Sequence, residues 1–169
     1  HGGTDLSYAT QARIALTKGH EHLRAMRLTA QGILRVYAAC CNTPVAHVPS
    51  AKLAFVGIPH LFMQLGPATP TRDEVLGPLV YQLQGRYCRG ELPAGAHMGT
   101  PLHLSLRGLA RMLWNTARRE QAPSPFHDAA TAAPTMPTLV LRAEEREHLR
   151  TNVPTPVAAV AGRFARSCS

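Results

Sequence analysis

The stretch TPLHLSLRGLARMLWNTARRE, residues 100–120, carries the clearest secondary-structure signal in the chain. Thr100 is a favourable N-cap residue, and Pro101 suits the first helical position, where its missing N–H removes no hydrogen bond. Apolar residues then recur at helical spacing, so that one side of the segment is apolar. We therefore predict one long helix that runs to Arg119 or Glu120.

Caps and apolar spacings elsewhere in the sequence predict further helices. Thr71 and Glu74 fit a capping box, which predicts a helix that continues to about Gly85. Residues 139–150 indicate another helix, with a short strand at Thr138–Leu141 as the alternative reading of its start. The remaining predicted helices cover residues 6–18, 29–40, 50–59 and 157–166.

The predicted fold class is mostly α, built from paired antiparallel helices with solenoid-like repeats as one arrangement. No alternating strand pairs joined by Asn-Gly or Asp-Gly turns are visible, which argues against an all-β fold. Residues 121–137 are rich in Pro and Ala and predict a linker. The expected organisation is a helical domain at 1–120, the linker at 121–137, and a C-terminal helix with a partner-bound tail at 138–169.

The charge of the chain favours an anionic partner. The formal net charge is +8, the pI is about 10.0, and the cations are 16 arginines and 2 lysines. No carboxylate occurs between Glu21 and Asp73. Arginine binds phosphate and carboxylate bidentately, so nucleic acid, an anionic lipid surface or an acidic protein are the expected partners. General basic drift of the composition is the alternative explanation.

Two segments of the sequence echo each other. Leu28–Tyr37 and Leu104–Leu113 align without gaps, with Leu, Gly and Arg matching at the first, fifth and eighth positions. The segment LARMLWNTA, residues 109–117, is similar to octotricopeptide-like and FAST-kinase-like helical repeats. That resemblance implies paired-helix repeats of the kind found in organelle RNA-binding proteins and mitochondrial ribosomes. The alternative is that two amphipathic helices rich in Leu, Ala and Arg align equally well by composition.

Arginines at helical spacing supply the candidate contacts to RNA, because one basic helix face suits a phosphate backbone. Tyr37 and Trp114 could stack on bases, but each also fits the apolar side of its predicted helix and is expected in the core. The predicted RNA-binding residues are Arg24, Arg27, Arg35, Arg107, Arg111, Arg118, Arg119, Arg163 and Arg166.

No motif predicts catalysis, a metal site or a cofactor. The histidines lack the spacing of a known metal site, and neither a nucleophile elbow nor a glycine-rich phosphate loop occurs. The four cysteines include no C-x-x-C pair, which favours a reducing compartment. No apolar run is long enough for a transmembrane helix. The chain starts at His1, for which a cleaved transit peptide and a shortened N-terminus are both explanations.

The sequence therefore predicts a non-catalytic structural subunit of a mitochondrial ribosome, located in the matrix. It would contact rRNA through its arginines and neighbouring subunits through its tail, and would not act as a free monomer. An accessory subunit of a respiratory complex or ATP synthase is the alternative, and a small helical enzyme or regulator is a third possibility.

Overall fold

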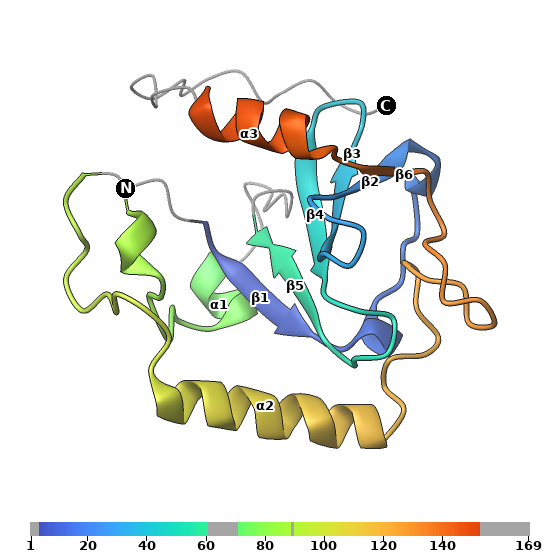
Figure 1. Ribbon diagram of the computed structural model, residues 1–169. Helices are drawn as coiled ribbons and strands as arrows, with labels where there is room; N and C mark the ends of the chain where they lie inside the picture. Colours follow the sequence, from blue (N-terminus) through green and yellow to red (C-terminus); the bar gives the residue numbers. More distant parts are fainter. Residues whose placement is uncertain (1–3, 61–70, 89, 153–169) are drawn as a thin grey trace.

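A mixed six-stranded sheet forms the centre of the protein (Figure 1). The computed structural model describes residues 4–60, 71–88 and 90–152. The strands lie in the order β1-β5-β4-β3-β2-β6, in which β6 runs parallel to β2 and every other pair is antiparallel. Their bounds are β1 Leu6–Ala9, β2 Leu23–Arg27, β3 Leu34–Ala38, β4 Thr43–Val48, β5 Val56–Pro59 and β6 Thr138–Val140.

Helices lie outside the sheet in the described part of the chain. The α-helices are α1 Arg72–Leu76, α2 Leu102–Ala117 and α3 Ala143–Thr151, and short 3-10 turns occupy Gln11–Arg13, His20–His22 and Gly85–Tyr87. In Figure 1, α2 runs along the bottom of the view and α3 along the top. None of the described helices is long and apolar enough to cross a membrane.

One face of the sheet is buried because apolar residues alternate along its central strands. Leu34 and Val36 of β3 are buried while the residues between and after them are partly exposed, and β2 shows the same alternation. Successive side chains of a strand point to opposite faces, so this period of two places one set in the core. We refer to the buried side as the inner face and to the other as the outer face.

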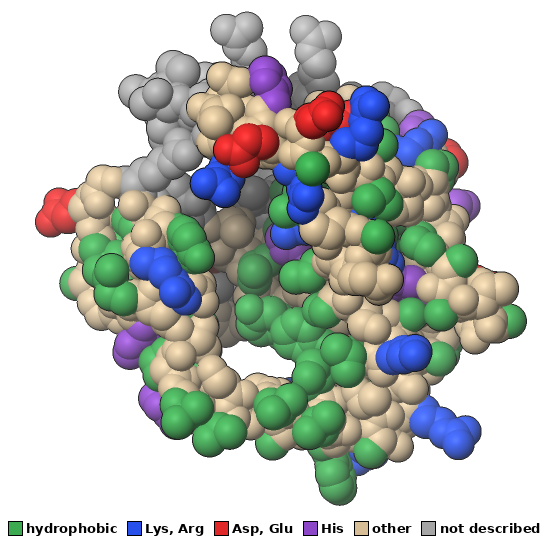
Figure 2. Space-filling model, viewed as in Figure 1, with side chains coloured by type: hydrophobic (Ala, Val, Ile, Leu, Met, Phe, Trp, Pro, Cys, Tyr) green, Lys and Arg blue, Asp and Glu red, His purple; other side chains and the backbone are tan. Residues whose placement is uncertain are grey.

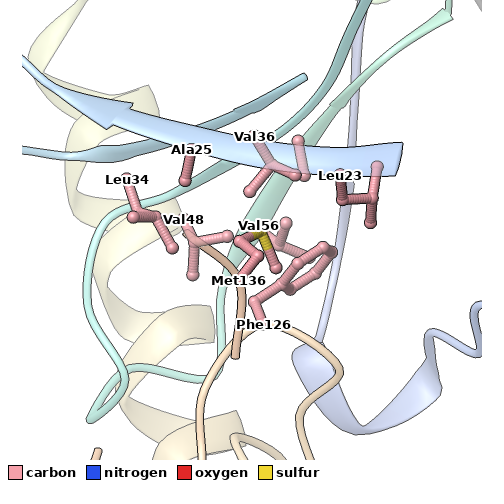
Figure 3. Packing of buried hydrophobic residues seen from close by; sticks show 9 residues of the cluster. Leu23, Ala25, Leu34, Val36, Val48, Val56, Phe126 and Met136 are labelled. Atoms are coloured by element: carbon pink, nitrogen blue, oxygen red, sulfur yellow. The ribbon is translucent and has the colours of Figure 1, made fainter. Parts of the chain in front are cut away.

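The core is completed by two side chains from the segment 121–137. Phe126 and Met136 are buried and pack against the inner face beside Leu23, Val48 and Val56 (Figure 3). The segment predicted as a linker thus carries part of the hydrophobic core. The division of the chain at 121 and 137 stays a prediction.

A fully buried glutamine joins three distant segments. The Gln11 amide Nε2 donates hydrogen bonds to the backbone oxygens of Ser50 at 2.9 Å and Leu53 at 2.7 Å. Its Oε1 accepts a hydrogen bond from the Ser124 hydroxyl at 2.6 Å. Because a buried amide without partners is unfavourable, this set of bonds fixes the N-terminal segment against the β4–β5 connection and the segment that follows α2.

The C-terminal end of α2 is hydrogen-bonded to segments that lie beside Gln11. The Ala54 backbone N–H donates to the Thr116 hydroxyl at 3.0 Å, and the Ala12 N–H donates to the Glu120 backbone oxygen at 3.0 Å. Arg13 forms a salt bridge with the Glu120 carboxylate at 3.3 Å. No residue of α2 is buried, so these contacts hold the helix by one end.

The prediction of a mostly α fold of paired helices is wrong. Three of the predicted helices contain a strand instead: β1 lies within 6–18, β3 within 29–40 and β5 within 50–59. In short segments rich in Leu, Val and Ala, the same residues satisfy a helical period and a strand period. The hairpins also use connections longer than a two-residue Asn-Gly turn. The sequence therefore lacks the turn motif by which strand pairs are usually predicted.

The predicted helical repeat is absent as well. The segment Leu28–Tyr37 contains the β2–β3 connection and most of β3, whereas Leu104–Leu113 lies inside α2. Two segments with different secondary structure are not copies of one structural unit. The alignment therefore reflects shared composition, and the helical-repeat description does not apply to this fold.

Several local predictions are confirmed. The long helix is present as α2, with Pro101 rather than Thr100 at the N-cap. The Glu74 carboxylate accepts from the Thr71 backbone N–H at 2.5 Å, although α1 ends at Leu76 instead of continuing to Gly85. Both alternatives near residue 140 occur, since β6 precedes α3. The predicted helix at 157–166 lies outside the described residues.

Candidate nucleic-acid interface

A row of side chains crosses the whole outer face of the sheet. The strand register places one residue from each strand in line, and most of these side chains are half-buried or exposed. Tyr8 at one edge is 63% exposed and Leu139 at the other is 52% exposed. In spatial order the row consists of Leu139, Met26, Arg35, His47, Gly57 and Tyr8.

A second arginine lies beside this row. Arg24 of β2 pairs with Tyr37 of β3, and Arg35 lies two residues before Tyr37 on the same strand. Residues in this diagonal relation lie about 7–8 Å apart on one face of an antiparallel pair. Arg24, Arg35 and Tyr37 therefore form a compact basic and aromatic group on the outer face.

Both guanidinium groups keep donors available. Arg24 Nη1 donates to the backbone oxygens of Glu21 at 3.0 Å and Leu23 at 2.8 Å, and Arg35 Nη1 donates to the Ile33 oxygen at 3.3 Å. Neither arginine forms a salt bridge with a carboxylate among the described residues. Since a guanidinium has five N–H donors, each group can still bind an anion from solution.

His47 makes the centre of the row polar without adding charge. Burial lowers the pKa of His47, and the nearby Arg35 cation lowers it further. The imidazole is therefore neutral at ordinary pH and offers one donor and one acceptor. On the next strand, Gly57 lies beside the ring of Tyr8, which stacks on Phe55 with ring centroids 4.9 Å apart.

Arg27 does not belong to this group. It lies at the end of β2, where its Nη1 donates to the Gly32 backbone oxygen at 2.9 Å and braces the β2–β3 connection. Its cation also contributes to the lowered pKa of His127, a buried residue, although burial is the larger cause. The predicted helical stripe of Arg24, Arg27 and Arg35 is thus divided by the strand geometry.

The other predicted arginines lie on a separate element. Arg107, Arg111 and Arg118 are exposed and follow one side of α2, and Arg119 comes directly after the helix. The Arg118 guanidinium lies over the ring of Trp114, 5.9 Å from its centroid. Arg163 and Arg166 lie outside the described residues.

The aromatic residues are placed differently from the prediction. Trp114 was expected in the core and is 64% exposed, while Tyr37 is half-buried on the outer face. Tyr8, Met26 and His47 also belong to the site, and none of them was predicted from the sequence. Strand alternation was the signal that could have found them, because Met26 and His47 lie next to buried residues and Tyr8 lies next to Ala9, which packs against the core.

Metal ligands do not cluster in the described part of the chain, where no group of three or more His, Cys, Asp or Glu side chains converges. The outer face therefore offers guanidinium groups, aromatic rings and one neutral imidazole. These groups can bind phosphate, stack on planar rings and exchange hydrogen bonds.

Comparison with protein families gives a match over most of the chain. The model of a protein family described as "Family of unknown function (DUF6151)" matches residues 1–136. No curated protein and no solved structure matches the chain.

Proposed function

The chain belongs to a protein family of unknown function, DUF6151, whose description names no activity, and we propose from the chain's own residues that it binds single-stranded RNA. The proposed site is the outer face of the sheet, around Arg24, Arg35 and Tyr37. The protein would act there as a non-catalytic binding subunit of a larger ribonucleoprotein.

The single observation that carries this proposal is the juxtaposition, on the outer face of the sheet, of one tyrosine and two arginines that have no carboxylate partner among the described residues. Arginines follow the phosphate backbone and supply most of the binding free energy, while an aromatic ring stacks on an unpaired base. A duplex keeps its bases stacked inside, so this combination favours single strands.

The wider sheet face adds to the same argument. Tyr8, at the other end of the cross-strand row, offers a second ring, and six strands spaced by about 4.8 Å give an extended surface. The net charge of +8 favours association with any polyanion. The α2 arginines remain a prediction for additional phosphate contacts.

A mitochondrial ribosome in the matrix stays our predicted assembly, and a respiratory complex or ATP synthase stays the alternative. The basic composition supports the first. The helical-repeat resemblance that also pointed to it has no counterpart in the fold. Sedimentation of native lysate with and without RNase tests this choice, since a ribosomal subunit moves with particles that collapse on RNase treatment.

RNA binding itself is tested by fluorescence anisotropy with labelled single-stranded and duplex oligonucleotides at several salt concentrations. The double variant Arg24→Gln/Arg35→Gln should bind the single strand more weakly. Loss of two phosphate contacts should also reduce the slope of log affinity against log salt by about 1.4. The matched control is Arg142→Gln, an exposed arginine of the α3 N-cap that pairs with Glu145.

Tyr37→Leu separates stacking from charge. It should weaken binding to the single strand by about 1–3 kcal/mol and leave the salt slope unchanged. Equal affinities of the wild type, the double variant and the control would refute the proposed site, and absence of binding to any single strand would refute the function.

A further inference from the structure

The helix α2 turns an apolar side toward solvent. Leu102, Leu106, Leu109 and Leu113 recur at spacings of four, three and four residues, which places them on one side of the helix. All four are exposed, and Leu102 reaches 74%. Figure 2 shows hydrophobic side chains projecting from α2 at the bottom of the view. A helix of a folded domain normally turns this side toward the core.

The side of α2 that faces the protein is a different one. Leu104, Met112, Asn115 and Thr116 are the partly buried residues of the helix, and Thr116 makes the hydrogen bond to Ala54. Helical geometry places these residues on the side roughly opposite to Ala110 and Ala117, which extend the leucine stripe. The leucine stripe therefore borders the protein-facing side near Thr116 and continues, through Ala110 and Ala117, onto the side that points away from the body, where a large partner can reach it.

Cations border the apolar side. Arg107, Arg111 and Arg118 lie along one of its edges, with the exposed Trp114 between them and the leucines. His103, near the N-terminal end of α2, lies along the same edge. No carboxylate occurs between Glu91 and Glu120, so the whole helix and its approach carry only positive charge.

These features specify the chemistry of the partner. Leucines on one side, arginines at the edge and a tryptophan at the boundary characterise helices that lie in a membrane interface. The helix has 16 residues and is about 24 Å long, shorter than the roughly 30 Å hydrocarbon core, so it would lie on the surface and not span it.

We propose that α2 binds the surface of an anionic phospholipid membrane. The four leucines enter the boundary between headgroups and acyl chains, Trp114 lies at headgroup level, and the arginines contact lipid phosphates. A second copy of the chain fits less well, because it would bring the same three arginines to the interface, whereas lipid phosphates neutralise them. This site is separate from the sheet face and does not rest on RNA binding.

The only tryptophan of the chain reports directly on this contact. The full-length protein is mixed with phosphatidylcholine vesicles that contain or lack phosphatidylserine, and vesicle flotation and Trp114 emission are recorded. Flotation with the anionic vesicles should be accompanied by a blue shift of the emission and by quenching from brominated acyl chains. Vesicles without phosphatidylserine should bind much more weakly, and added salt should weaken the anionic binding.

Matched variants separate the two parts of the surface. Leu106→Gln and Leu109→Gln should each weaken vesicle binding by about tenfold, because each removes one buried leucine from the lipid. Arg107→Glu/Arg111→Glu should remove the preference for anionic vesicles. The control Leu149→Gln alters an exposed leucine of α3 and should leave binding unchanged. Since all these positions are exposed, circular dichroism should show that each variant keeps the fold.

Three results would overturn the proposal. One is an unshifted Trp114 emission with anionic vesicles, and another is equal binding to vesicles with and without phosphatidylserine. The third is a dimer in light scattering that Leu106→Gln converts to a monomer while vesicles have no effect, which would assign the apolar side to a second copy. The Arg24→Gln/Arg35→Gln variant should still bind vesicles, so failure of the RNA proposal is recognised separately.

Discussion

Replacement of Gln11 by methionine tests whether one buried amide holds the three segments together. Methionine has nearly the same length and volume, so the substitution removes hydrogen bonds without opening a large cavity. It leaves the backbone oxygens of Ser50 and Leu53 and the hydroxyl of Ser124 without their partner. Each of the three hydrogen bonds contributes about 1 kcal/mol, and water only partly replaces the lost partner at the buried groups. The free energy of unfolding should therefore fall by about 3–4 kcal/mol.

The assay is urea unfolding followed by circular dichroism and analysed by linear extrapolation. Gln31→Met is the matched control, because Gln31 is exposed and should change stability by less than about 0.5 kcal/mol. Ser124→Ala removes the bond to Gln11 and the bond that Ser124 accepts from the Phe126 N–H, and should lose about 1–2 kcal/mol. A Gln11→Met variant as stable as Gln31→Met would refute the reasoning.

Two further predictions concern the segment 121–137. Phe126→Ala should lose about 3–5 kcal/mol of stability, because Phe126 is buried in the core, whereas Tyr87→Ala at an exposed ring should lose little. Urea unfolding measures both, and similar values would contradict the assigned core. His127 should make stability depend on pH: burial and Arg27 lower its folded-state pKa below the usual value of about 6.5. The unfolded chain then binds the proton more readily, so stability should fall as pH drops through about 6.5 and level off below the folded pKa. In unfolding curves across this range, His127→Gln should show a smaller pH dependence than the wild type. An unchanged dependence would contradict the assignment.

The strands were missed for a physical reason that the β2–β3 hairpin illustrates. Leu34, Arg35 and Val36 alternate correctly for a strand, but five residues are too few to separate this period from a helical one. In the sheet, Leu34 pairs with Val48 and Arg35 pairs with Met26, and these partners lie 14 and 9 residues away along the chain (48 − 34 and 35 − 26). A propensity that is weak locally is overridden by such contacts.

The residue types of the candidate site could be predicted from the sequence, but their arrangement could not. The excess of arginine over carboxylate was visible in the composition, and Arg24 and Arg35 were both named as contacts. Their position beside Tyr37, and the separation of Arg27 from them, depend on strand register. A shift of one residue would exchange the two faces of the sheet, so no local pattern could have supplied this arrangement.

What the sequence determined by itself is best seen in α2 and in the start of α1. A helix forms its hydrogen bonds between residues four apart, and a capping box joins residues three apart, so both are specified by neighbours along the chain. Tertiary structure alone decided that Phe126 and Met136 complete the core, and that the leucines of α2 face solvent. Burial depends on what lies across from a side chain in space, and the partners in this fold come from strands as far apart as residues 6 and 140.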